Sequence, residues 1–174
     1  REASLMDPHQ RVFLQCAHAA MENAGYGGSR LKGSDTGVFV GFSDDMRQGY
    51  AGMVAQAEPG ELSFSVPGNL ASIIAGRVAH HLDLRGPALV VDTACSSALV
   101  AVHLACQSLR TGECAQAIAG GVKLNLHPVD SGIRIGIESS TARTRSFDAD
   151  ADGTGIGEGV GALLLKPLGR ARED

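Results

Sequence analysis

The chain has 174 residues, which suits one domain, and 44% of them are hydrophobic, enough for a core. The net charge of −4 at pH 7 implies no basic face for nucleic acid, and no apolar run approaches the ~20 residues of a membrane span. Four cysteines without a C-x-x-C pair, together with no visible signal peptide, favour a reducing, cytosolic setting over a secreted disulfide scaffold.

The first 82 residues predict a helix, a strand and a second helix. Asp7-Pro8 opens the first helix with an N-cap and a first-turn proline, and Gly25 ends it. Its expected core face consists of Val12, Cys16, Ala19, Ala20 and Ala24. Residues 36–40 are an apolar run that predicts a strand buried on both faces, as in α/β sheets. Residues 69–82 have helical spacing with Asn69 as the expected N-cap.

Residues 88–111 predict a buried strand, a sharp turn and a helix, with Cys95 in the turn. Apolar residues at 99, 102, 105, 106 and 109 mark one helix face, and Gly112 stops the helix. A side chain on such a turn projects from the end of the sheet, and the helix start behind it favours an anion there. Cys95 is therefore a candidate thiolate nucleophile, and its own N–H is placed to donate to an oxyanion on a thioester carbonyl. Position alone leaves a buried, unreactive cysteine equally open.

The last third of the chain is rich in glycine. Residues 116–126 predict a strand in which Gly120-Gly121 marks the close approach of another backbone, and residues 161–165 predict a further strand. Residues 148–153 copy the opening of a calcium-binding EF-hand loop, but its twelfth position is Gly159 instead of glutamate. Residues 157–162 fit a loose dinucleotide fingerprint without a preceding strand. We reject both the calcium and the dinucleotide interpretation.

The histidines offer no obvious partner for Cys95. His80 and His81 are adjacent on a predicted helix, so their side chains point in different directions and do not form a metal site. His103 lies eight residues after Cys95, roughly 12 Å along a helix axis, too far to act as its base. The spacing does not exclude His127.

Residues 92–105, Asp-Thr-Ala-Cys-Ser-Ser-Ala-Leu-Val-Ala-Val-His-Leu-Ala, resemble the nucleophile motif of β-ketoacyl synthase (ketosynthase) domains of type I modular polyketide synthases. Further motifs of that family follow in order along essentially the whole chain, at 6–11, 24–26, 36–41, 68–69, 75–77, 84–87, 112–114, 119–122, 147–148, 151–153, 157–159 and 165–168. One departure is Pro67, where the family often has threonine. So many matches in order make the nucleophile the preferred interpretation of Cys95.

The resemblance implies the thiolase-like fold, an α/β architecture of layers αβαβα built from two similar halves. Residues 1–174 are then expected to be a partial ketosynthase domain, most of the N-terminal half, with the C-terminal half absent. The implied activity is that of an acyltransferase: Cys95 takes an acyl chain, and a malonyl-type extender decarboxylates and attacks it. The two histidines that serve these steps in the family would follow Asp174, so the chain alone is not expected to condense.

The resemblance also implies the partners and the setting. The substrates would be carried on the phosphopantetheine of acyl carrier protein, with no cofactor or metal bound by the domain itself. Other polyketide synthase domains and a second copy in a homodimer are the expected partners, with no nucleic acid and no membrane. A cytoplasmic role in antibiotic biosynthesis is expected.

Three alternatives stay open: a non-condensing domain that only passes chains along, a scaffold subunit, and a fatty-acid β-ketoacyl synthase. Cys95 argues against a pure scaffold, which needs no thiolate. The pair Ser96-Ser97 and residues 6–8 favour a polyketide over a fatty-acid enzyme. Residues 136–140 and 152–155 resemble the polyketide lines served by a separate acyltransferase (trans-AT).

Overall fold

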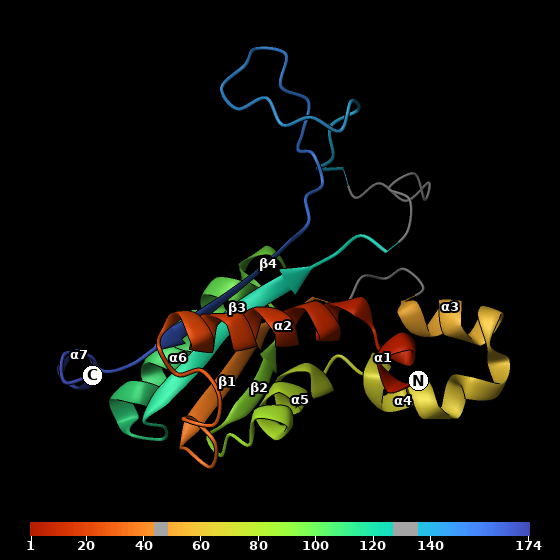
Figure 1. Cartoon of the computed structure of the whole chain (residues 1–174). Coiled ribbons are helices and arrows are strands. Elements are labelled where there is room, and N and C mark those ends of the chain that lie inside the picture. Colours follow the sequence, from red (N-terminus) through yellow and green to blue (C-terminus); the bar gives the residue numbers. More distant parts are fainter. Residues whose placement is uncertain (44–48, 127–135) are drawn as a thin grey trace.

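The computed structural model describes residues 1–43, 49–126 and 136–174, so that His127 lies outside the described residues. Its centre is a mixed four-stranded sheet (Figure 1) of β1 (Thr36–Gly41), β2 (Ala88–Val91), β3 (Gln116–Lys123) and β4 (Gly159–Leu165). The order is β2-β1-β3-β4; β1 is parallel to β2 and β3, and β4 is antiparallel to β3. The predicted α/β class and the positions of all four predicted strands are confirmed.

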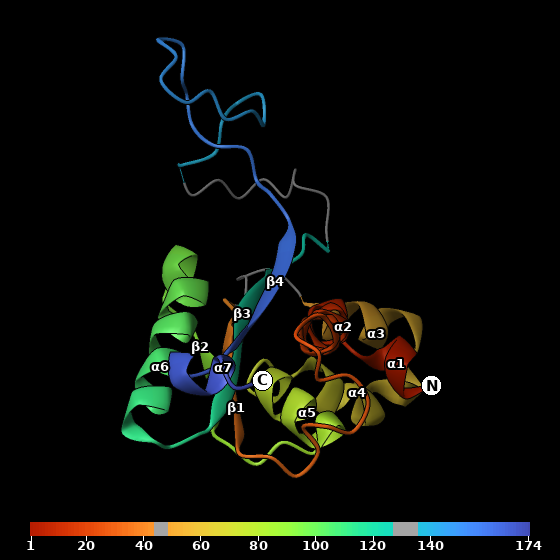
Figure 2. The same ribbon diagram turned by 60° about the vertical axis from the view of Figure 1, so that its left-hand side comes forward.

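Helices cover both faces of this sheet. Figure 2 shows α6 (Ser97–Thr111) on one face, with α2 (Pro8–Asn23) and α5 (Ile73–Leu82) on the other. The short elements α1 (Glu2–Leu5), α3 (Tyr50–Ala57), the 3-10 helix η1 (Pro59–Glu61) and α4 (Leu62–Asn69) gather beside one end of α2 (Figure 1). The chain ends with α7 (Leu168–Ala171). No helix within the described ranges is long and apolar enough to cross a bilayer.

The core has two parts, one on each side of the sheet. All six residues of β1 are buried, as predicted, because helices lie on both of its faces. Val38 and Val40 face α2 and α5 and join a large apolar cluster, whereas Phe39 joins a smaller cluster under α6. The α6 side is lined mainly by alanines, so this helix lies close to the sheet.

The predicted core face of α2 is wrong by about one residue. The helix buries Phe13, Ala17 and Met21, while Cys16 is only half-buried and Ala19 is exposed. The spacing i, i+4, i+8 of this set places its two large apolar side chains against the sheet, which removes more apolar surface from water than the predicted set of small residues. The predicted cap is confirmed, since the Asp7 side chain accepts a hydrogen bond from the N–H of His9.

The predicted start of the next helix is also wrong. Asn69 ends α4 instead of capping α5, which begins at Ile73 after Ser72. The Asn69 side-chain amide donates to the carbonyls of Leu5 (2.8 Å) and Ser65 (2.7 Å). Its amide NH2 group is therefore used to join α4 to the end of α1.

Two further burial predictions fail at β2 and α6. Strand β2 was expected to be buried but is an edge strand of the described sheet, with Leu89 47% exposed. Helix α6 presents Ala101 and Ala105 to the sheet, and Leu99 on the predicted apolar face is 77% exposed. Strand β2 is exposed because it lies at the edge of the sheet, and Leu99 is exposed because α6 turns its smallest residues toward β1 and β3.

Candidate active site

The predicted strand, turn and helix around residue 95 are confirmed. Strand β2 ends at Val91, the 3-10 turn η2 (Ala94–Ser96) follows, and α6 begins at Ser97. Cys95 lies in the middle of η2 as a free and exposed cysteine. The thiol therefore stands at the end of the sheet and at the start of a 15-residue helix, where the helix dipole favours an anion.

Ala94, directly before Cys95, has a left-handed backbone with φ of +54°. A residue with a Cβ in this region costs about 1–2 kcal/mol, so the surrounding structure must hold it there. The Ala94 N–H donates to Oδ1 of Asp92 (2.9 Å), and the Ala94 carbonyl accepts from the N–H and, at 2.7 Å, from the Oγ of Ser97. Both polar groups of the strained residue are thus fixed.

The rest of the turn is held by the same few side chains. Ser97 Oγ also accepts from the N–H of Thr93 at 2.9 Å. Ser96 Oγ donates to the Thr93 carbonyl at 2.8 Å, and the Ser96 N–H donates to the same carbonyl at 3.3 Å. Among the hydrogen bonds of the described residues, none uses the N–H of Cys95. That donor is free to meet a ligand.

Glycines at the ends of two strands admit the start of α6. A Cβ on Gly41 would lie 2.6 Å from the Cα of Ala98, and one on Gly121 would lie 2.8 Å from the Cβ of Ala98. Distances under 3.0 Å are essentially never seen for a Cβ, so a side chain at either position would push the helix away. A Cβ on Gly120 would likewise collide with the carbonyl of Gly161, so the predicted close approach at Gly120-Gly121 is confirmed.

The described residues bring no histidine into a hydrogen bond with Cys95. His103 is exposed on α6, and both His80 and His81 are exposed near the end of α5. In the described ranges there is also no group of three or more His, Cys, Asp or Glu side chains that could hold a metal ion.

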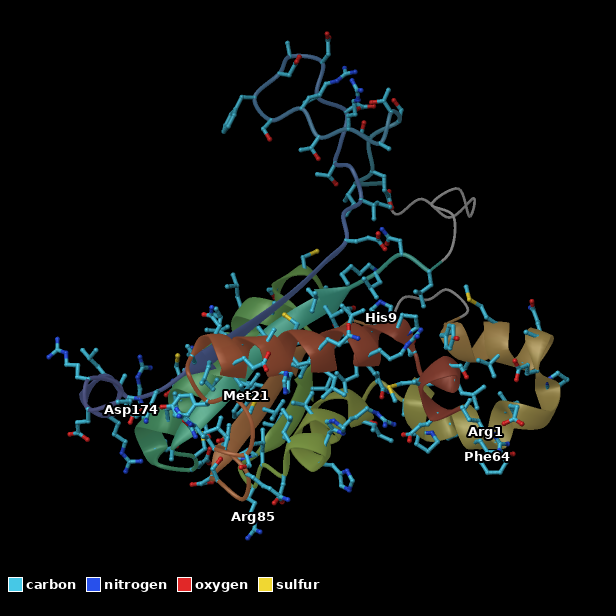
Figure 3. The ribbon with its side chains drawn as sticks, in the orientation of Figure 1. Arg1, His9, Met21, Phe64, Arg85 and Asp174 are labelled. Atoms are coloured by element: carbon cyan, nitrogen blue, oxygen red, sulfur yellow. The ribbon has the colours of Figure 1, made fainter. Side chains whose placement is uncertain are left out.

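A buried histidine that sequence reasoning passed over lies in the motif at 6–11. His9, labelled in Figure 3, is 7% exposed, with Nδ1 2.6 Å from Oδ1 of Asp7. The N–H of Leu124 donates to His9 Nε2 at 3.0 Å, and the His9 ring meets Phe42, the residue after β1, edge to face at 5.0 Å. His9 therefore joins the start of α2 to the chain just beyond β1 and β3. The sequence marked His9 only as part of the family motif. Its contact with Leu124 could not be predicted, because the two residues are 115 positions apart.

A second hydrogen-bonded group lies in residues 136–158, which precede β4 and extend away from the sheet (Figure 1). Asp152 accepts from Ser139 Oγ (2.7 Å), from Ser140 Oγ (2.5 Å) and from the Ser140 N–H (2.8 Å). The two serine hydroxyls and this N–H hold the pKa of the Asp152 carboxyl well below its usual range. The Asp152 carboxylate therefore joins residues 139–140 to residue 152 as a hydrogen-bond acceptor.

Comparison with known proteins places the chain in a family. The family model described as "Beta-ketoacyl synthase, N-terminal domain" matches residues 1–171. Polyketide synthase PksL of Bacillus subtilis is 46% identical over 184 aligned residues, and erythronolide synthase EryA2 of Saccharopolyspora erythraea is 47% identical over 175. These alignments cover 100% and 99% of the chain but only 4% and 5% of the relatives, so the chain spans a small part of the curated proteins that it matches.

Solved structures agree with this placement. The ketosynthase from module 6 of the bacillaene synthase of Bacillus subtilis matches with a TM-score of 0.82 at 39% identity, covering 99% of the chain and 29% of that structure. The oxazolomycin ketosynthase domain OzmH KS7 of Streptomyces albus matches with a TM-score of 0.80 at 36% identity, covering 99% and 30%. The fold is thus the thiolase-like fold of ketosynthases, represented here by its N-terminal part. The chain belongs to the β-ketoacyl synthase family, as the N-terminal part of a ketosynthase of the kind found in modular polyketide synthases.

Proposed function

We propose that Cys95 accepts an acyl chain as the nucleophile of a polyketide ketosynthase, and that this chain works as the nucleophile-bearing part of the complete ketosynthase domain. One observation carries the proposal: Cys95 is an exposed thiol on a turn whose strained Ala94 is hydrogen-bonded on both sides, at the start of α6. An unreactive cysteine does not need to be exposed, and it does not need a strained neighbour whose N–H and carbonyl are both held by hydrogen bonds.

In the first half-reaction the Cys95 thiolate attacks the thioester carbonyl of an acyl group held on the phosphopantetheine of acyl carrier protein. The carbonyl oxygen becomes an oxyanion, and the free N–H of Cys95 is the donor from this chain that can meet it. The carbon–sulfur bond to the carrier then breaks, the phosphopantetheine thiolate leaves, and the acyl chain remains as a thioester on Cys95.

In the second half-reaction a malonyl-type group on acyl carrier protein loses CO₂ and becomes an enolate. The enolate carbon attacks the Cys95 thioester, and the Cys95 thiolate leaves as the β-ketoacyl product forms on the carrier. The resemblance to the family implies two histidines for this step, and no described histidine of this chain is hydrogen-bonded to Cys95. The condensation is therefore assigned to the complete domain, with other polyketide synthase domains and a second copy as partners and no cofactor of its own.

The test uses the complete ketosynthase domain that contains this chain, with an acyl thioester and then malonyl-acyl carrier protein, read by intact mass. We expect an acyl mass on Cys95 followed by a β-ketoacyl product on the carrier. Cys95→Ala should abolish the acyl mass, and Cys106→Ala, which replaces a half-buried cysteine of α6, should retain it. Acylation without a condensed product would favour a chain-passing domain, and the absence of any acyl mass on Cys95 would refute the proposal.

A further inference from the structure

The Ser97 side chain has an unusual position for a helix residue. Its hydroxyl accepts from the N–H of Thr93 and donates to the carbonyl of Ala94, which spans the whole turn that carries Cys95. Ser97 is 5% exposed, so bulk water does not reach these bonds freely. Its own N–H also donates to the Ala94 carbonyl, which gives that carbonyl two donors from one residue.

The Ala94 carbonyl and the Cys95 N–H belong to the same peptide unit. No peptide bond of the described chain is cis, and in a planar trans peptide the N–H points opposite to the C=O. Ser97 holds the carbonyl toward the start of α6, so the Cys95 N–H points the other way, out of the turn. Hydrogen bonds to the carbonyl also polarise the peptide unit, and the N–H becomes a stronger donor.

We propose that Ser97 is a positioning residue for acyl transfer: by holding the Ala94 carbonyl, it fixes the direction of the Cys95 N–H that receives the oxyanion. This inference rests on the proposed function of Cys95. It assigns to Ser97 no contact with the substrate. Its role is to remove the freedom of one peptide unit, which otherwise has to be ordered anew in each turnover.

Two reactions of the same thiol separate this role from a general effect on the turn. Acyl transfer builds an oxyanion on the substrate and needs the N–H, whereas alkylation of Cys95 by iodoacetamide displaces iodide and builds no oxyanion. In the complete domain, Ser97→Ala should lower the maximal rate of Cys95 acylation by about tenfold to a hundredfold. The half-saturating concentration of acyl thioester and the alkylation rate should stay within about twofold of the wild type, because neither depends on the oxyanion.

The matched control is Ser108→Ala. Ser108, near the far end of α6, is also a buried serine, 3% exposed, and its hydroxyl oxygen accepts a hydrogen bond from the thiol of Cys114. Ser108→Ala should lower the melting temperature by about as much as Ser97→Ala does, and it should leave the rate of Cys95 acylation within about twofold of the wild type. Ser97→Thr keeps the hydroxyl and should recover most of the acylation rate.

Three outcomes would overturn the inference. Wild-type acylation in Ser97→Ala would show that the bond to Ala94 is not needed. An equal loss of acylation and alkylation would show that Ser97 supports the thiol or the fold and not the N–H. A wild-type domain that is alkylated at Cys95 but never acylated would refute the proposed function itself, and the inference with it.

Discussion

Gly41, the last residue of β1, offers a direct test of how the sheet places Cys95, the proposed nucleophile. A Cβ there would stand 2.6 Å from the Cα of Ala98, whereas ordinary van der Waals contact begins at 3.4 Å. The start of α6 would have to retreat by at least about 0.8 Å (3.4 minus 2.6) to accept the methyl group, because the backbone N of Ala98 and C of Ser97 lie closer still. The opposing atoms belong to the backbone and cannot rotate away, so the turn with Cys95 must move with the helix.

The size of the effect follows from that displacement. Overpacking of this kind costs about 1–3 kcal/mol of folding free energy. A nucleophile moved by nearly 1 Å loses about tenfold to a hundredfold in rate. We therefore expect Gly41→Ala to lower both the melting temperature of the complete domain and the rate at which Cys95 acquires an acyl mass.

The matched control is Gly76→Ala in α5, where a Cβ meets no described atom within 4 Å. Alanine is the better helix former by about 0.5–1 kcal/mol, so this variant should melt at or above the wild-type temperature and acylate normally. The reasoning would be refuted if Gly41→Ala were acylated at the wild-type rate, or if its melting temperature equalled that of Gly76→Ala.

Three further predictions concern other parts of the chain. Cys95 should be alkylated in the native state, whereas Cys114, 3% exposed, should react only after denaturant is added; peptide mass mapping that finds equal labelling would contradict the fold. The carboxyl of Asp152, followed by ¹³C NMR, should titrate below its ordinary pKa of 3.8. The ionised carboxyl therefore holds the segment in order above pH 3.8, and this contribution is lost only as the pH falls through the lowered pKa. Ser140→Ala should raise the pKa of Asp152 back toward 3.8. An unchanged pKa would show that the Ser140 hydroxyl does not lower it. His9→Ala should lower the free energy of unfolding in urea by about 2–4 kcal/mol, because it removes a buried ring and leaves its hydrogen-bond partners unsatisfied; an unchanged midpoint would show that the ring contributes nothing.

The sequence predicted elements better than it predicted their orientation. The Asp7-Pro8 cap and the unbroken apolar run of β1 depend on a few neighbouring residues, and both are confirmed. The face that a helix buries depends instead on what the sheet presents to it. In α2 the large side chains Phe13 and Met21 outweigh the stripe of small residues beside them.

The candidate site divides in the same way. The turn that carries Cys95 lies within a few residues of sequence, so its strand, turn and helix could be predicted, and the family motif marked Cys95 as the candidate nucleophile. The hydrogen bonds of Ser97 are equally local, but they form because Ala94 has a left-handed backbone, which an alanine in the sequence does not predict. The contact of His9 with Leu124 spans 115 residues and requires the fold.

The composition of the chain can be explained from the site outward. The start of α6 lies over the ends of β1 and β3 only because Gly41, Gly121 and Ala98 present almost no side chain at that crossing. The same close approach continues along the helix through Ala101 and Ala105. Once these small residues face the sheet, the larger apolar residues of α6 must lie on other faces, which is why Leu99 is exposed. The scarcity of aromatic residues, 4% of the chain, and its 23 glycines thus fit a fold in which Cys95, the proposed nucleophile, is placed by backbones in close contact.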